Sequence, residues 1–182
     1  MPGSARPFFL LLALVLSLGF SMWARAGQAA PLSVTSPAFR DGDKMPRSVG
    51  CEGGEHSPAL SIVAAPSGTV SLAVLMTELD PPKAGAALWM VYNLPPNTAS
   101  LPENQPRTRT LKNDALQLLA ASGKMGYTGP CQNPGAFKRY AIEVFALDSM
   151  LDLPEGADKP TFLLAVEGHI LARAMLTGRY KK

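Results

Sequence analysis

The chain has 182 residues, of which 47% are hydrophobic and 17% charged, and its formal net charge is +3. Globular domains usually span about 100–200 residues, so this length suits one domain. Charges this nearly balanced argue against nucleic-acid binding and against attraction to a membrane by bulk charge, so any cationic function has to be local.

The first 26 residues have the pattern of a secretory signal peptide. Arg6 precedes an apolar run over 8–23, and the small-x-small sequence Ala-Arg-Ala follows at 24–26. The alternative is an uncleaved anchor helix, although the run is short for the ~20 residues that a span needs. We expect cleavage after Ala26 and export, to the periplasm rather than outside the cell. The mature chain, 27–182, is then a single domain with no transmembrane anchor.

The mature chain contains two cysteines, Cys51 and Cys131. In an oxidising compartment, an even number of cysteines favours a disulfide over free thiols. The cysteines and the two histidines lack the spacing of a zinc site, and no metal or cofactor is expected. Closing a loop of about 80 residues would stabilise the fold by roughly 4 kcal/mol in the chain-entropy model. The bond would also tie the loop at 51–58 to the loop at 129–135.

The first half of the domain predicts strands that are buried on both faces. Continuous apolar runs at 68–80 and 87–95 indicate two such strands, and the second is stopped by Pro95 and Pro96. Residues 96–126 are predicted to be largely loop. An apolar patch inside them, 115–121, could form one or two helical turns.

The second half predicts one more alternating strand and one helix. Residues 139–147 alternate, with Tyr140, Ile142 and Val144 on one face. The best helix covers 157–169, with Asp158 as its N-cap. Residues 170–180 suit a strand or a helix, and we interpret them as a closing strand. The fold class is therefore a β-dominated α+β domain.

Recognisable catalytic signatures are missing from the sequence. The segment around Gly123-Lys124 lacks the first glycine and the hydroxyl of a phosphate-binding P-loop. Glu78 and Asp80 lie two residues apart at a strand end, so both carboxylates could face one site. Alternatively, Asp80 opens the following turn and Glu78 pairs with a nearby cation. Paired acids alone are weak evidence for catalysis, and we predict that the protein is not an enzyme.

Four segments together resemble the phosphatidylethanolamine-binding protein family, in particular its bacterial Raf kinase inhibitor-like branch. They read CEGGEHSPAL, ELDPPKAG…LWMVYNLP, GKMGYTGPCQNPGAFKRYAIEVFALD and EGHILARAMLTGRY, in the family's order. The likeness covers about residues 32–180. It implies a β-sandwich around a central, largely antiparallel sheet, with a C-terminal helix. It also implies a pocket at one end of that sheet for small anions or phospholipid head groups.

The resemblance also implies which residues form that pocket, and two of them depart from the family pattern. Leu88 stands where the family has a histidine on the strand, and Lys138 replaces the histidine of a His-Arg-Tyr motif. The implied ligand-binding residues are Glu78, Asp80, Pro82, Trp89, Gly129, Pro130, Lys138 and Tyr140.

Two arrangements of the altered pocket remain open. Lys138 could pair with Glu78 or Asp80 and close the site, or it could hold an anion with a charge that no longer titrates near neutral pH. The first hypothesis for function is thus an exported, non-enzymatic binding protein with an altered anion pocket. The alternative is a protein-interaction module that inhibits an exported protease or another exported enzyme. The surface to inspect for it is the loop at 97–113, which carries Arg107, Arg109 and Lys112.

Overall fold

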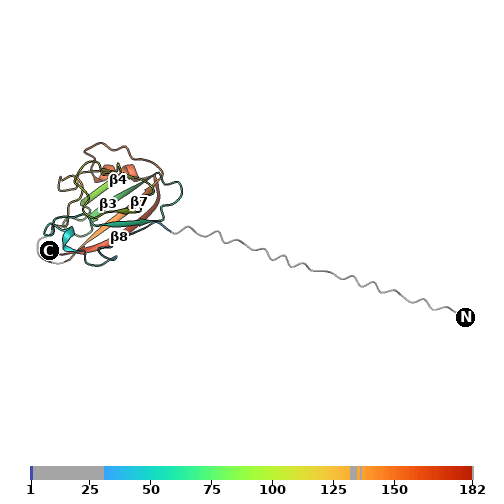
Figure 1. Ribbon diagram of the computed structural model, residues 1–182, viewed down its shortest axis with the longest axis horizontal. Coiled ribbons are helices and arrows are strands. Elements are labelled where there is room, and N and C mark those ends of the chain that lie inside the picture. Colours follow the sequence, from blue (N-terminus) through green and yellow to red (C-terminus); the bar gives the residue numbers. More distant parts are fainter. Residues whose placement is uncertain (2–30, 132–134, 136, 182) are drawn as a thin grey trace.

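The computed structural model describes residue 1 and residues 31–131, 135 and 137–181, which form two antiparallel sheets and one α-helix (Figure 1). The predicted signal peptide lies outside the described residues. The small sheet has the order β1-β2-β5, from β1 (Ser33–Thr35), β2 (Leu60–Val63) and β5 (Ser100–Leu101). The large sheet has the order β6-β4-β3-β7-β8, from β6 (Leu116–Gln117), β4 (Ala87–Leu94), β3 (Ser71–Glu78), β7 (Lys138–Leu147) and β8 (Ile170–Tyr180).

The centre of the large sheet is built from the apolar runs of the sequence. Every residue of β3 is buried, as expected for a strand covered on both faces. β3 lies between β4 and β7 and pairs antiparallel with both. The three strands predicted here are confirmed, and the β-dominated fold with one late helix is confirmed with them.

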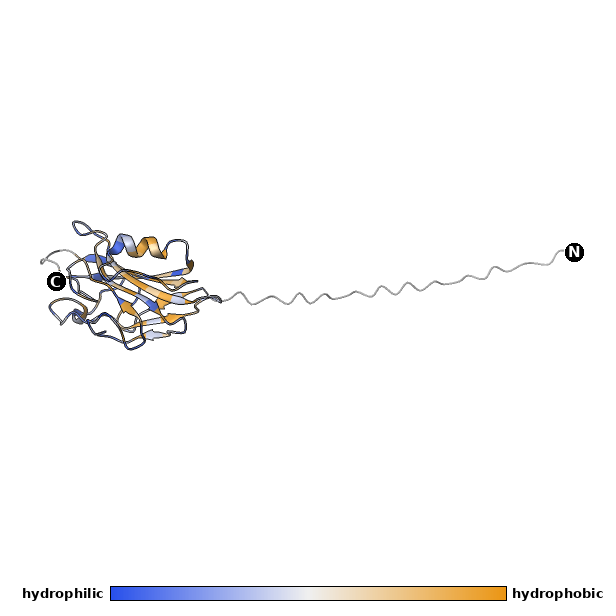
Figure 2. Cartoon of the chain, turned by 90° about the horizontal axis from the view of Figure 1, so that it is seen from above, coloured by the Kyte–Doolittle hydropathy of each residue, from blue (hydrophilic) through white to orange (hydrophobic). Residues whose placement is uncertain are grey.

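Each face of the large sheet has its own core. Tyr140, Ile142 and Val144 of β7 pack with the small sheet, as the alternation predicts. Phe145 points to the opposite face and packs with Phe162 of α1 (Lys159–Val166). Figure 2 shows α1 lying over that face of the large sheet. The domain is therefore layered, with the large sheet between the small sheet and the helix.

The C-terminal elements refine the predicted boundaries. The Asp158 carboxylate caps α1 by accepting a hydrogen bond from the Thr161 N–H at 2.9 Å, as predicted. The helix ends at Val166 rather than at 169, because Gly168 adopts a φ of +86° and turns the chain into β8. Residues 170–180 form the strand β8, which pairs with β7 along its length.

The expectation of helical turns at 115–121 is wrong. Leu116 and Gln117 form β6, which pairs with Tyr92 and Val91 of β4. The Gln117 side chain is fully buried, and its oxygen accepts a hydrogen bond from the Trp89 indole nitrogen at 2.8 Å. Sheet pairing and this buried contact outweigh the weak local preference of a short apolar segment.

Four strand ends meet at one end of the large sheet. β3 and β8 finish there and β4 and β7 begin there, with Lys138 of β7 opposite Tyr180 of β8. The short 3₁₀ turn η1 (Arg47–Val49) lies at the same end. In the described part of the chain, no helix is long and apolar enough to cross a membrane.

Candidate functional site

A cavity of about 400 Å³ opens at this end of the large sheet. Its walls come from the end of β3, the start of β4, the loop after β6 and the loop around residue 55. The lining residues are Glu55, Glu78, Lys83, Ala86, Ala87, Leu88, Ala121, Ser122, Lys124, Thr128, Gly129, Pro130 and Cys131. The volume lies within the ~300–1,000 Å³ that small-molecule sites usually have.

The wall on the β4 side is apolar. Ala87 and Leu88 are both buried and both line the cavity. The Leu88 carbonyl accepts a hydrogen bond from the Thr128 N–H at 2.8 Å, which brings the loop over 128–131 against the strand. Leu88 thus places a hydrocarbon side chain in the wall of the cavity, at the position where the resemblance implies a histidine in the family.

The opposite wall consists of two loops held together covalently. A disulfide joins Cys51 to Cys131, with their Cα atoms 5.4 Å apart, so the predicted bond is confirmed. The Tyr127 hydroxyl donates to the Val49 carbonyl at 2.9 Å nearby. A Cβ atom on Gly129 would lie 2.3 Å from that same carbonyl oxygen, so glycine is required for this approach. The wall is therefore fixed by a bond, a buried hydrogen bond and close packing.

The structure separates the two acids that could have shared a site. Glu78 is 2% exposed and lines the cavity. Asp80 lies outside the lining, where its carboxylate accepts hydrogen bonds from the Arg139 main-chain N–H at 2.7 Å and from the guanidinium at 2.8 Å. The hydrogen bond from the Arg139 side chain, followed by the one from its main chain, lowers the pKa of Asp80 to about 2.

Lys138 lies beside the turn that follows β3 and is not part of the cavity lining. Its ammonium donates to the main-chain oxygen of Pro81. Asp80 takes Arg139 as its ion-pair partner. The Lys138 ammonium therefore bonds the turn at 79–82, and the cations of the cavity come from other residues.

The remaining predicted residues divide between the cavity and the core. Gly129 and Pro130 line the cavity, and their role in ligand binding stays a prediction. Trp89 and Tyr140 are fully buried in the core between the sheets, away from the cavity surface. Pro82 lies in the exposed turn. Three of the eight predicted residues thus meet at the cavity, and the other five support or surround it.

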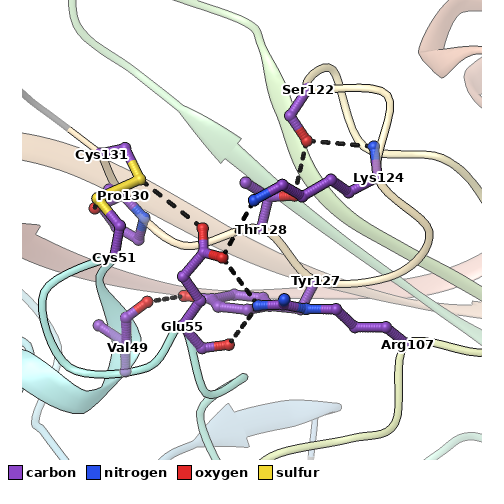
Figure 3. The surroundings of a disulfide bond; sticks show 10 residues. All are labelled: Val49, Cys51, Glu55, Arg107, Ser122, Lys124, Tyr127, Thr128, Pro130 and Cys131. Atoms are coloured by element: carbon purple, nitrogen blue, oxygen red, sulfur yellow. Dashed lines mark hydrogen bonds and ion pairs between the residues drawn. A yellow bond between two sulfur atoms is a disulfide. The ribbon is translucent and has the colours of Figure 1, made fainter.

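Three charged lining residues were not identified from the sequence: Glu55, Lys83 and Lys124. The Glu55 side chain is 10% exposed, and its carboxylate pairs with Arg107 at 2.9 Å and with Lys124 at 3.4 Å (Figure 3). Figure 3 also shows this carboxylate beside the disulfide. The sequence signal that could have identified Glu55 was its position near Cys51 in the glycine-rich loop, because the disulfide holds that loop at the cavity.

The charges of the cavity are of both signs. Glu78 and the Glu55 side chain are shielded from solvent, whereas Lys83 and Lys124 are exposed at the rim. Such a lining offers oxygen acceptors inside and ammonium donors at the opening, next to an apolar wall. It suits a small ligand that carries both a positive and a negative group.

Known proteins share this sequence pattern and architecture. The model of the phosphatidylethanolamine-binding protein family matches residues 35–181. The chain belongs to this family. A UPF0098 protein of Methanothermobacter thermautotrophicus is 36% identical over 151 residues, which cover 83% of this chain and 99% of that relative. A UPF0098 protein of Chlamydia muridarum is 37% identical over 156 residues, 83% of this chain and 99% of the relative.

Two crystal structures of family members have the same fold. The homologue CT736 of Chlamydia trachomatis aligns with a TM-score of 0.75 and 35% identity, covering 84% of this chain and 98% of its own. E. coli YbcL, a member of the mammalian phosphatidylethanolamine-binding protein family, aligns with a TM-score of 0.78 and 28% identity, covering 84% and 99%. The fold and family implied by the four sequence segments are thus both confirmed.

Proposed function

We propose that this member of the phosphatidylethanolamine-binding protein family is an exported, non-enzymatic binding protein for a small phosphorylated head group. Phosphoethanolamine, which joins one phosphate to one ammonium through two methylenes, represents the ligand class. The family's name, the cavity at the end of the large sheet and a disulfide compatible with export all support this function.

The observation that carries the proposal is the charge distribution over one cavity. A buried carboxylate, Glu78, lines the same space as the rim ammonium of Lys83 and as Lys124, whose ammonium also pairs with Glu55. Phosphate is bound well by lysine as a point charge, and an ammonium is bound well by a carboxylate with little water around it. The apolar surface of Leu88 suits the methylenes that separate the two charges.

The pocket is altered relative to the family's pattern. One family histidine corresponds to Leu88 in the cavity wall, and the other corresponds to Lys138, which bonds the main chain of the neighbouring turn. Imidazole is the side chain that ordinarily changes charge near neutral pH. We infer that ligand affinity here depends on fixed charges instead of on histidine protonation.

The alternative function, inhibition of an exported protease or other enzyme through the loop at 97–113, has less support. Arg107 pairs with Glu55, and Arg109 bonds the Tyr92 hydroxyl and the Gln117 carbonyl. Two cations of the proposed contact surface are thus used to hold the domain together. We retain the cavity as the functional site.

Calorimetry of the purified protein with three ligands tests the proposal. Phosphoethanolamine should bind more tightly than inorganic phosphate or ethanolamine alone. Glu78→Gln should weaken phosphoethanolamine roughly tenfold or more, because a charged hydrogen bond at a buried site is lost. Lys83→Ala should weaken it about two- to fivefold, because the rim charge is exposed to solvent.

Lys112→Ala is the matched control, since Lys112 is an exposed lysine of another loop. It should bind phosphoethanolamine like the unchanged protein. Absence of binding to all three ligands would refute the head-group proposal. Equal losses in Lys83→Ala and Lys112→Ala would show that the lysines act through net charge rather than at the cavity.

A further inference from the structure

A second hollow, the basic hollow, lies at the same end of the large sheet as the cavity, and a different set of residues lines it. Its volume is about 530 Å³, and its lining residues are Lys44, Arg47, Glu52, Phe137 and Lys181. They come from the turn before η1, from η1 and the loop after it, and from the positions just before β7 and just after β8. Figure 1 shows η1 beside the end of β8, near the C-terminus.

The basic hollow gathers positive charge that has little counter-charge around it. Lys44 and Lys181 are both exposed, and neither forms an ion pair with the described part of the chain. Arg47 pairs with Glu52 at 3.1 Å, so the acid of the lining offsets one cation. Elsewhere on the surface, three arginines are each paired with an acid. The basic hollow therefore keeps two ammonium groups for a partner.

An aromatic ring lies among these cations. Phe137 is 43% exposed. The Arg179 guanidinium carbon is 5.7 Å from the centroid of the ring, and the Lys181 ammonium is 6.0 Å from it. Cation–π attraction at such distances favours keeping the ring and the two cations together. The basic hollow therefore offers exposed apolar surface directly beside positive charge.

The main chain holds the cationic segments in place. The Arg179 N–H donates a hydrogen bond to the Asp43 carbonyl at 2.8 Å, and the Arg179 carbonyl accepts one from the Met45 N–H at 2.8 Å. The turn that carries Lys44 is thus bonded to the end of β8, which Lys181 follows. Charges that are already positioned reduce the entropy lost when a partner binds.

The shape and chemistry of the basic hollow discriminate among anionic partners. A small inorganic anion would leave the Phe137 ring exposed to water, and a flat anionic membrane would not fill a concave space. The nearly balanced net charge provides no general attraction for nucleic acid. A peptide segment can supply carboxylates for the two ammonium groups and an apolar side chain for the ring.

We propose that the basic hollow is a docking site for an acidic segment of a partner protein, in which glutamates or aspartates flank an apolar side chain. The carboxylates pair with Lys44 and Lys181, and the apolar side chain packs on Phe137. This surface is separate from the cavity and from the loop at 97–113. The inference goes beyond the proposed function and does not depend on it.

Fluorescence anisotropy of labelled peptides tests the proposal. The peptide Ser-Glu-Glu-Leu-Glu-Glu-Ser is titrated with the purified protein, beside a peptide with glutamine in place of each glutamate. Only the glutamate peptide should bind. Its affinity should fall when sodium chloride is raised from about 50 mM to about 500 mM, because salt screens exposed charges. Excess phosphoethanolamine should leave its binding unchanged, since the cavity is a different space.

Substitutions of single residues locate the contact. Lys44→Ala and Lys181→Ala should each weaken the glutamate peptide about two- to fivefold, the size expected for an exposed ion pair. Lys112→Ala, which removes an exposed lysine from another loop, is the matched control and should bind like the unchanged protein. Phe137→Ala should abolish the preference for leucine over alanine at the centre of the peptide.

Several results would overturn the proposal. They are absence of binding, equal binding of the glutamate and glutamine peptides, and losses in Lys112→Ala as large as those in Lys44→Ala and Lys181→Ala. Displacement of the peptide by phosphoethanolamine would overturn it too, by placing the peptide in the cavity. Phosphatidylglycerol vesicles that bind through Lys44 and Lys181, without binding of the peptide, would assign the basic hollow to a membrane surface instead. Peptide binding weakened only by the substitutions in the basic hollow is the result expected.

Discussion

The charged residues at the end of the large sheet differ in what they contribute. Asp80 and Arg139 form an ion pair on the surface, whereas Glu78, two residues before Asp80, faces the cavity. Sequence spacing suggested that the two acids could act together. The strand ends at Glu78, so the period of two that would place both side chains on one face does not extend into the turn.

The Asp80–Arg139 pair predicts a pH dependence of stability. The folded-state pKa of Asp80, about 2, lies below its ordinary value of 3.8. The stabilisation is therefore complete above about pH 5, and it is lost as the pH falls through 3.8 towards 2. In urea unfolding at a series of pH values, the advantage of the unchanged protein over Asp80→Asn should shrink across this window. A constant difference from pH 7 to pH 2 would contradict the role of the carboxylate charge.

At the scale of elements, two loops far apart in sequence form one wall. The disulfide from Cys51 to Cys131 and the Tyr127 bond to Val49 cross the same interface between them. A wall that is already ordered reduces the entropy lost when a ligand binds. The disulfide could be predicted from the number of cysteines together with the predicted signal peptide. The packing of Gly129 on Val49 could not, because it depends on how the loops meet in space.

Glycine at 129 is required by that packing, which a pair of alanine substitutions tests. Gly129→Ala should lower the free energy of unfolding by about 1–3 kcal/mol, because a methyl group would meet the Val49 carbonyl oxygen. It should also weaken phosphoethanolamine binding by displacing the wall. Gly156→Ala is the control, since a Cβ at that position has nothing within 4 Å. Similar free energies of unfolding for the two variants in urea would show that the wall accommodates the added methyl group without loss of stability.

At the scale of the whole molecule, the cavity opens where four strand ends meet. β3, β4, β7 and β8 all begin or end there, so short loops from distant parts of the chain converge on one place. The sheet supplies rigid positions and the loops supply the charged groups. This division explains why the fold was predictable from hydrophobic pattern, while the members of the site were only partly predictable.

The predicted export belongs to the same scale, because an oxidising compartment would be the place where the disulfide forms. Expressed in a Gram-negative bacterium, the protein should be recovered from the periplasm with Gly27 as its first residue and without free thiols. Cell fractionation, N-terminal sequencing and thiol titration check these expectations. A protein recovered from the cytoplasm with its first 26 residues intact would contradict the predicted signal peptide.

The sequence by itself determined the family, the main strands of the large sheet, the helix cap at Asp158 and the disulfide. These features depend on local patterns: continuous apolar runs, a capping residue, paired cysteines and four segments that occur in the family's order. The tertiary structure alone decided which partners the charged residues have. Lys138 bonds the Pro81 carbonyl, and Arg139 forms an ion pair with Asp80. The cavity lining combines Glu78 with Glu55, Lys83 and Lys124. The physical reason is that partner choice among nearby charges depends on where side chains point in space, which spacing along the chain does not specify.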